Sequence, residues 1–340
     1  MLCLRRFASR DDAFYRNDCN HCFCLPSPIA TPMSARMLKA FVLGAGLGTR
    51  LRPLTEQLPK PLVPYFHRPL IEHVFDHLLQ AGVTEFVVNT HHLPEAYPQA
   101  FPEGHYRGAR LTFRHEPVLL ETGGGIANIA DLMGDEPFLV YNGDILTDLP
   151  LEPLIQAHQQ NDNFVTLALR TSGPSLCVAY DAQQGIITDI LNRLGSGDPG
   201  THQFTGVYMV SPQFVRELTP GKIESVVPVW LRLIQAGNRI GAVVIDDGDW
   251  CDLGDRDSYL DAHVQCNNSL PPLHPEARIA LSAALYGKNT IGPNAVVGES
   301  AVLEDCILWP GAVAEPGANL KRCIIRSGIS ASGTHVNADF

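Results

Sequence analysis

Short apolar runs typical of buried strands alternate with helical patterns along the chain as far as about residue 265. These runs cover residues 38–43, 85–90, 111–115, 138–142 and 240–245. Between the first two runs, Leu70, Val74 and Leu78 recur at a spacing of four, which predicts a helix over residues 69–81. Strands that alternate with helices are typical of α/β folds. The pattern therefore predicts a Rossmann-like domain with a mixed, mostly parallel sheet covered on both faces.

The C-terminal part of the chain has a different period. Apolar residues recur there at every sixth position, at Ile279, Leu285, Ile291, Val297, Leu303 and Trp309. Pro-Gly pairs at 310–311 and 316–317 keep the same interval. A period of six indicates a short left-handed parallel β-helix. We place it at residues 279–336, after a linker at 268–278.

The first 36 residues show no periodicity, and Met37 directly precedes the first predicted strand. We interpret residues 1–36 as an extension that is disordered or lies upstream of the true translation start. Cys19, Cys22 and Cys24 with His21 resemble one half of a metal knuckle, but no second ligand pair follows at the spacing of a zinc site. The nine cysteines are an odd number in a long chain, which argues against a disulfide framework.

A glycine-rich loop with several cations follows the first predicted strand. It provides backbone that can approach a ligand closely, and Arg and Lys side chains that bind phosphate. Its residues are Leu43, Gly44, Ala45, Gly46, Gly48, Thr49, Arg50, Arg52 and, after a short interval, Lys60. This pattern predicts a site for a polyanionic ligand such as a nucleoside triphosphate.

Two common glycine loops do not fit this pattern. A P-loop needs a Lys directly after its last glycine, and none is present. A dinucleotide fingerprint needs a third glycine where Thr49 stands, and an acidic residue at the end of the next strand, which instead ends in Asn89 and Thr90.

The loop resembles the signature of the sugar-1-phosphate nucleotidylyltransferases. The similarity rests on G-x-G-T-R-L-x-P-L-T at 46–55 and P-K-P-L at 59–62, and it extends from Leu38 to about Gln265. The resemblance implies a nucleotidyltransferase catalytic domain at residues 37–267. It also implies that a sugar 1-phosphate attacks the α-phosphorus of a nucleoside triphosphate and releases pyrophosphate.

A second glycine-rich turn follows the strand at 111–115 and opens a helix that is predicted to reach about Met133. Its residues are Glu121, Thr122, Gly123 and Gly124. Because the C-terminal edge of an open α/β sheet is where such folds bind ligands, the turn is a second candidate for contacts with the nucleotide. The resemblance assigns this region to the base and the ribose.

The strand at 138–142 ends in Asn142, Gly143 and Asp144. A carboxylate at the rim of a core needs a partner, so Asp144 indicates either a divalent cation or a helix cap. The resemblance supports the cation, since the G-D pair of the family supplies a magnesium ligand. It also assigns a second Mg²⁺ ligand to Asp252, in Trp250-Cys-Asp-Leu-Gly254. Asp255-Arg256, directly after this motif, departs from the Gly-Thr that is frequent in the family.

The resemblance further assigns residues to the sugar phosphate. The residues that it assigns are Asn142, Arg193, Thr205 and Gly206. Arg193 stands where many relatives carry a Lys, so a planar fork replaces a point charge. In the implied mechanism, Arg50, Lys60, Asp144 and Asp252 are the catalytic residues, and they act by positioning the substrates and neutralising charge.

Charge and composition narrow the class of partner. The 25 basic and 36 acidic residues give a net charge of −11, which disfavours nucleic acid and anionic membranes. No apolar run reaches the roughly 18 residues of a membrane span. Together with the resemblance, this indicates a cytoplasmic enzyme that binds a nucleoside triphosphate, a sugar 1-phosphate and Mg²⁺. We expect its β-helix to pack on the catalytic domain or on a second subunit, in which case the protein is a homo-oligomer.

The sugar and the base stay open at this stage. The motifs at 121–125 and 204–206 resemble N-acetylmuramate-1-phosphate uridylyltransferases, whereas a catalytic domain followed by a hexapeptide coil resembles mannose-1-phosphate guanylyltransferases. The alternatives are a choline-phosphate-type cytidylyltransferase, which shares the first loop, and a non-catalytic regulatory subunit that binds nucleotide sugars.

Overall fold

The computed structural model describes residues 38–265 and 270–340. The interpretation of residues 1–36, with their cysteines, lies outside the described residues. Residues 37–340 form one compact unit by their contacts. No helix in the described part of the chain is long and apolar enough to cross a membrane.

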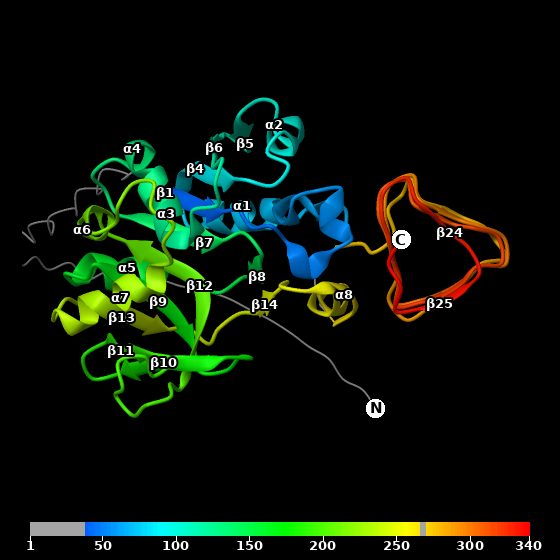
Figure 1. Ribbon diagram of the computed structural model, residues 1–340. Coiled ribbons are helices and arrows are strands. Elements are labelled where there is room, and N and C mark those ends of the chain that lie inside the picture. Colours follow the sequence, from blue (N-terminus) through cyan, green and yellow to red (C-terminus); the bar gives the residue numbers. More distant parts are fainter. Residues whose placement is uncertain (1–37, 266–269) are drawn as a thin grey trace, which may run out of the picture. The chain divides into compact units, whose positions relative to one another are not determined.

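A mixed ten-stranded sheet forms the centre of the N-terminal part (Figure 1). Its strands in spatial order are β10 (Leu176–Asp181), β11 (Ile186–Ile190), β13 (Ile240–Val244), β9 (Val165–Arg170), β12 (His202–Val210), β7 (Phe138–Asn142), β1 (Leu38–Leu43), β4 (Val83–Thr90), β6 (Ala109–His115) and β5 (His105–Tyr106). The strands β7, β1, β4 and β6 run parallel, whereas β12 is antiparallel to β7 and β9. The predicted fold class is confirmed.

Helices cover both faces of this sheet. They are α1 (Leu70–Gln80), α2 (Ala96–Ala100), α3 (Glu121–Asn128), α4 (Ala130–Met133), α5 (Glu152–Gln160), α6 (Pro212–Arg216) and α7 (Val226–Gln235). A further helix, α8 (Arg256–Gln265), belongs to a separate cluster with Trp309 and Ile324. In β1, Ala40 and Val42 belong to the core cluster that includes α1 and α5, whereas Phe41 belongs to the cluster that includes α3, α6 and α7. Successive residues of a strand point to opposite faces, so one buried strand contributes to both cores.

Several short elements follow or connect the strands of this sheet. They are the 3-10 turns η1 (Thr49–Leu51), η2 (Leu54–Glu56) and η3 (Lys60–Leu62), the pair β2 (Pro64–Tyr65) and β3 (Arg68–Pro69), and the pair β8 (Ile145–Thr147) and β14 (Trp250–Asp252). The helix predicted at 69–81 is α1. The helix predicted from 121 to about 133 is interrupted at Ile129, whose backbone leaves the helical region, and forms α3 and α4.

The C-terminal part is a parallel β-helix of the left-handed type, drawn as a triangular coil in Figure 1. Three short parallel sheets form its sides. They are β15 (Arg278–Ile279), β18 (Val296–Val297), β21 (Val313–Ala314) and β24 (Ser330–Ala331); β16 (Ala284–Tyr286), β19 (Val302–Glu304), β22 (Asn319–Lys321) and β25 (Thr334–Val336); and β17 (Thr290–Ile291), β20 (Ile307–Leu308) and β23 (Ile324–Ile325).

The six-residue period fails at one of its predicted positions. Ile291 pairs with Leu308, not with Trp309, so the step from Leu303 to the next inward residue is five. Leu308 therefore belongs to the inner core of the coil, whereas Ile307 and Trp309 belong to a separate cluster with residues from the N-terminal part. Trp309, which the six-residue spacing includes, therefore does not occupy an inward position, because that turn is one residue shorter.

Two buried histidines and one partly buried histidine make the fold sensitive to acid. Burial lowers the pKa of His158 and His263 to about 4, and burial together with the nearby Arg68 charge lowers the pKa of His73 to about 4. Between pH 4 and 6.5 these side chains are neutral when folded and protonated when unfolded. The unfolded chain then binds more protons, so stability is present above about pH 6.5 and is lost as the pH falls toward 4.

We expect His158→Gln to weaken the dependence of stability on pH. The free energy of unfolding in urea, measured from pH 7.5 to pH 5, should fall less steeply for the variant than for wild type. The two slopes should differ by up to about 1.4 kcal/mol per pH unit, because one titrating group is gone. Parallel curves for the two proteins would show that His158 does not titrate on unfolding. His105→Gln, at an exposed position, is the matched control for the substitution.

Candidate active site

The loop after β1 is fixed through its first glycine. The Gly44 amide donates to Asn89 Oδ1 at 2.8 Å, and the Tyr97 hydroxyl donates to the Gly44 carbonyl at 2.9 Å. A β-carbon on Gly44 would lie 2.7 Å from the Asn89 carbonyl oxygen, so only glycine allows this approach. A β-carbon on Gly46 would meet nothing within 4 Å. Space for a ligand therefore lies beside Ala45 and Gly46.

A buried carboxylate joins this loop to the second glycine-rich turn. Glu116 is fully buried, accepts from Asn89 Nδ2 at 2.8 Å and accepts from the Leu120 amide at 3.1 Å. A β-carbon on Gly125 would lie 3.2 Å from Glu116 Oε1, which explains the small residue there. One side chain thus connects Gly44, through Asn89, with the residue that precedes α3.

The glycines at the start of α3 serve close packing. The amides of Gly123 and Gly124 both donate to the Glu224 carbonyl, at 2.7 and 3.0 Å. A β-carbon on Gly124 would lie 2.2 Å from the Lys222 carbonyl oxygen. These two amides are therefore occupied by protein and not by a ligand, contrary to the expectation of accessible backbone there. Thr122 Oγ1 accepts from the Val226 amide at 3.0 Å and so orders the same segment.

Asp144 follows β7 and meets a lysine from η3. Lys60 Nζ lies 2.7 Å from Asp144 Oδ2, and the lysine side chain is nearly buried. Gly143 allows this geometry, because its amide donates to the Leu43 carbonyl and a β-carbon there would lie 2.5 Å from that oxygen. The next element is β8, a strand, so Asp144 is not a helix cap.

The β8–β14 ladder brings the second predicted carboxylate to the first. Asp252 pairs with Ile145 in an antiparallel register, and the Leu253 amide donates to the Asp144 carbonyl at 3.1 Å. Burial, and then the negative charge of Asp144, raise the pKa of Asp252. Asp252 Oδ1 is buried and has no hydrogen-bond partner among the described residues. An orphaned, desolvated carboxylate oxygen beside a second carboxylate is suited to a hard cation.

Arg50 lies on the other side of Asp252. A β-carbon on Gly254 would lie 3.0 Å from Arg50 Nη1 and 3.2 Å from Asp252 Oδ1. Gly254 thus leaves room for the guanidinium beside the carboxylate. The Arg50 and Lys60 charges both oppose the rise in the pKa of Asp252. Two cations and two carboxylates therefore share one end of the site.

A cavity of about 380 Å³ opens between these elements. Its lining residues come from both glycine-rich turns, from η3, from the end of β7 and from the segment before α7. They are Leu43, Gly44, Ala45, Gly46, Lys60, Pro61, Asn89, Leu119, Glu121, Thr122, Asn142, Gly143, Asp144 and Ser225. Several of the residues that were predicted to bind the nucleotide and the sugar phosphate therefore line one cavity.

Gly48 and Thr49 do not line this cavity. Gly48 has a φ of +61° and its carbonyl accepts from the Leu51 amide and the Thr55 hydroxyl, which begins η1 at Thr49. Glycine is suited to this left-handed conformation. The two residues form the turn that carries Arg50.

The residues assigned to the sugar lie in two places. Asn142 lines the cavity, and Gly206, with a φ of +81°, packs against it, since a β-carbon there would lie 2.8 Å from Asn142 Nδ2. Thr205 is fully buried and its hydroxyl donates to the Ala168 carbonyl, so its side chain is not presented to a sugar. The Thr205 carbonyl instead accepts from Trp250 Nε1 at 2.8 Å and supports β14.

Arg193 is not among the residues that line the cavity, and it belongs to an exposed turn after β11. Leu191 and Asn192 both have positive φ there, at 57° and 51°. The buried Asp189 carboxylate fixes the turn, because it accepts from the amides of Leu194 and Ser196 and from the Ser196 hydroxyl. Arg193 forms no ion pair with any residue that the structure describes.

Sequence reasoning missed Glu116, Tyr97 and Ser225, and it did not assign Asn89 to the site. Glu116 and Tyr97 act through contacts across 27 to 53 positions of sequence, which no local pattern reports. A weak signal was available: Glu116 follows an apolar strand, as Asp144 does, and a carboxylate at a strand end needs a partner.

Comparisons with known proteins agree with this geometry. The profile of the family described as nucleotidyl transferase matches residues 39–269. Mannose-1-phosphate guanylyltransferase of Mycobacterium tuberculosis is 28% identical in an alignment of length 307 that covers 85% of this chain and 85% of that protein. Probable mannose-1-phosphate guanylyltransferase 1 of Oryza sativa subsp. japonica is 31% identical over 306 residues, with coverage of 86% and 82%.

Solved structures share the fold of the N-terminal part. HddC from Yersinia pseudotuberculosis, complexed with GMP-PN, has a TM-score of 0.56 at 20% identity and covers 66% of this chain and 98% of that one. A putative glucose-1-phosphate thymidylyltransferase from Bacillus anthracis has a TM-score of 0.58 at 19% identity, with coverage of 68% and 98%. The match of the family profile over most of the chain, with relatives similar along both of its parts, shows that this protein belongs to the nucleotidyl transferase family, among the sugar-1-phosphate nucleotidyltransferases.

Proposed function

We propose that this protein makes GDP-mannose and pyrophosphate from GTP and mannose 1-phosphate. The observation that carries the proposal is the similarity to proteins named mannose-1-phosphate guanylyltransferase over more than four fifths of both chains. That similarity includes the β-helix as well as the catalytic part. The β-helix was the feature that favoured this branch of the family at the level of sequence.

The base would bind between the two glycine-rich turns. Glu121 lines the cavity and has a φ of +58°, which is uncommon for a residue with a side chain. Its carboxylate offers two acceptors, and the N1–H and the N2 amino group of guanine form a matching pair of donors. Uracil also offers one N–H donor at N3, so a uridylyltransferase is the second candidate.

The two aspartates, of which Asp144 lines the cavity, fit a divalent cation. Asp144 and Asp252 provide two adjacent carboxylates, and the orphaned Asp252 Oδ1 lacks a partner that a cation would supply. Nucleotidyltransferases of this family generally use such a metal. The described residues contain no cluster of three or more His, Cys, Asp or Glu side chains that could hold an ion. We therefore assign Mg²⁺ to the two aspartates together with substrate oxygens, and it would supply charge neutralisation at the phosphates.

The chemistry needs no general base from the protein. A phosphate monoester is already anionic near neutral pH, and its oxygen attacks the α-phosphorus while pyrophosphate leaves on the opposite side. Lys60, held by Asp144, would orient the reacting phosphates. Arg50 would stabilise the charge that develops on the departing pyrophosphate. The amides beside Ala45 and Gly46 would hold the triphosphate.

Pyrophosphate release tests the substrate assignment. Purified protein with Mg²⁺ should release pyrophosphate fastest from GTP with mannose 1-phosphate, in a matrix of four nucleoside triphosphates against mannose, glucose and N-acetylmuramate 1-phosphates and choline phosphate. A preference for UTP with N-acetylmuramate 1-phosphate, or for CTP with choline phosphate, would assign the chain to that activity instead. Release with no pair at all would favour a regulatory subunit.

Arg50→Ala should lower kcat by about 100-fold, because one preorganised charge at a developing anion contributes a few kcal/mol. Steady-state kinetics with the preferred pair measure the loss. Arg52→Ala is the matched control, since Arg52 is an exposed cation in the same loop. Near-normal turnover of Arg50→Ala, or an equal loss in both variants, would remove Arg50 from the assigned role.

Asp144→Asn and Asp252→Asn should each lower kcat by about 100-fold at saturating Mg²⁺, and should raise the Mg²⁺ concentration for half-maximal activity, because a neutral amide is a poorer ligand than a carboxylate. Asp249→Asn changes an exposed aspartate three residues before Asp252 and should leave both values unchanged. A folded Asp252→Asn variant with unaltered Mg²⁺ dependence would contradict the assignment.

A further inference from the structure

The last coil of the β-helix contacts the two chain segments that carry Arg50 and Asp252. On the Arg50 side, Arg326 Nη1 donates to the Pro53 carbonyl at 3.1 Å and lies 3.5 Å from Glu56 Oε2. In the same region, Gln57 Nε2 lies 3.4 Å from the Ser327 carbonyl. The segment that leaves Arg50 is thus held at η2 by the β-helix.

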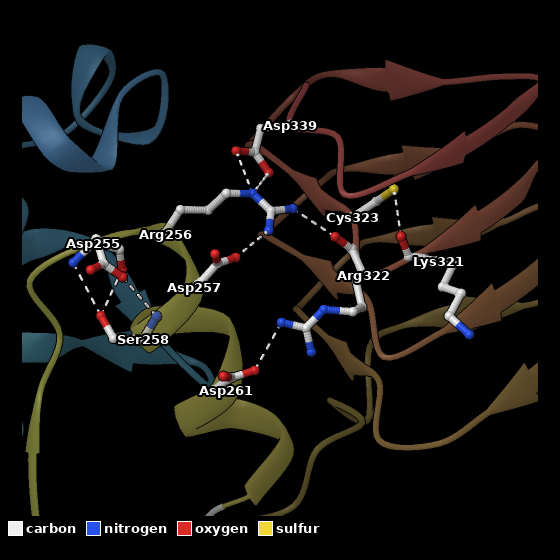
Figure 2. Close-up of polar contacts among 9 residues, drawn as sticks. All are labelled: Asp255, Arg256, Asp257, Ser258, Asp261, Lys321, Arg322, Cys323 and Asp339. Atoms are coloured by element: carbon white, nitrogen blue, oxygen red, sulfur yellow. Dashed lines mark hydrogen bonds and ion pairs between the residues drawn. The ribbon is translucent and has the colours of Figure 1, made fainter.

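On the Asp252 side the contact is an ion pair at the start of α8 (Figure 2). Arg256 Nε lies 2.8 Å from both carboxylate oxygens of Asp339, and Arg256 Nη2 donates to the Arg322 carbonyl at 2.6 Å. Asp339 is only 9% exposed and Arg256 18%, so this pair is largely shielded from solvent. Arg322 in turn donates to Asp261 on α8 at 2.9 Å.

The first turn of α8 transmits this contact toward Asp252. Asp255 and Ser258 cap the helix reciprocally, since the Ser258 amide donates to Asp255 Oδ1 and the Asp255 amide donates to Ser258 Oγ (Figure 2). The cap leaves Leu253 and Gly254 as the only residues between Asp252 and the fixed helix end. Movement of Arg256 would therefore move the backbone of Asp252.

An apolar layer lies beneath the polar contacts. Leu51 and Leu253, which directly follow Arg50 and Asp252, are each 1% exposed and belong to one cluster with Trp309 and Ile324 of the β-helix. Trp309 Nε1 donates to the Tyr259 hydroxyl of α8 at 3.0 Å. The neighbours of both charged residues are thus packed against the same outer face of the coil.

We propose that the β-helix is a positioning element of the active site, which holds Arg50 and Asp252 in register through Arg326 on one side and the Arg256–Asp339 pair on the other. The inference rests on the proposed function, since it assigns both residues to the reaction. Arg256, Arg326 and Asp339 do not line the cavity. They are positioning residues, and a displacement of about 1 Å at reacting groups can cost up to about 100-fold in rate.

Asp339→Asn is the first test, and Asp257→Asn is its matched control. Asp257 also pairs with Arg256, at 3.1 Å, but it lies on α8 itself and is 76% exposed, so its loss leaves the link to the β-helix intact. For Asp339→Asn we expect kcat to fall about tenfold, KM for both substrates to stay within about twofold, and the Mg²⁺ concentration for half-maximal activity to rise. Asp339→Glu, which keeps the charge, should recover most of kcat.

Arg326→Gln is the second test, because it acts on the Arg50 side alone. It should lower kcat while leaving the Mg²⁺ dependence unchanged. Hydrogen exchange of wild type and variants gives a readout that does not need turnover: Asp339→Asn should speed exchange at residues 250–254, and Arg326→Gln at residues 49–54. A role in stability alone would lower the unfolding midpoint without changing kcat or these segments.

The outcomes separate the two proposals. If wild type turns over and Asp339→Asn matches it in kcat, Mg²⁺ dependence and exchange at 250–254, the positioning role is wrong and the proposed function stands. Equal losses in Asp339→Asn and Asp257→Asn would also overturn it, because they would trace the effect to Arg256 and not to the β-helix. If wild type has no turnover with any substrate pair, the proposed function fails and the inference falls with it.

Discussion

The site depends on two aspartates that the fold forces together. The ladder of β8 and β14 places Asp252 opposite Ile145, so its carboxylate lies beside that of Asp144. Burial raises the pKa of Asp252, and the negative charge of the partly exposed Asp144 raises it further. Lys60 and Arg50 offset part of this cost, and Asp252 Oδ1 still lacks a partner among the described residues. The arrangement is costly for an apo protein and favourable for one that binds a cation and phosphates.

The nucleotide side of the cavity is rigid for a different reason. Backbone segments approach each other at Gly44, Gly124 and Gly143 more closely than any β-carbon would allow. Glu116 then joins the two loops by accepting from Asn89 and from the backbone before α3. A fully paired carboxylate in the interior fixes one arrangement, because an unmade hydrogen bond there would be expensive. The cavity is therefore formed before any ligand arrives.

Local patterns in the sequence predicted those features of the structure that depend on neighbouring residues. The strand β1, the helix α1 and the carboxylate at the end of β7 follow from apolar periodicity and from the cost of an unpaired charge. Contacts between segments that are distant in the sequence could not be predicted from such patterns. The T-G-V pattern at 205–207 does not tell which way Thr205 faces, and no periodicity reports that Glu224 occupies the amides at the start of α3. The interruption at Ile129 has no Pro or Gly to signal it.

The departure from the six-residue period at Trp309 occurs at the same contact as the positioning proposal. A perfect period of six would turn Trp309 inward and its neighbour Leu308 outward. The five-residue step after Leu303 turns Trp309 and Ile307 outward instead. Outward apolar side chains need a partner, and Tyr259 and Leu253 supply it. The regular repeat of the coil is thus interrupted where the coil contacts the segment that carries Asp252. Such a departure from the sequence periodicity is expected at a contact that the site requires.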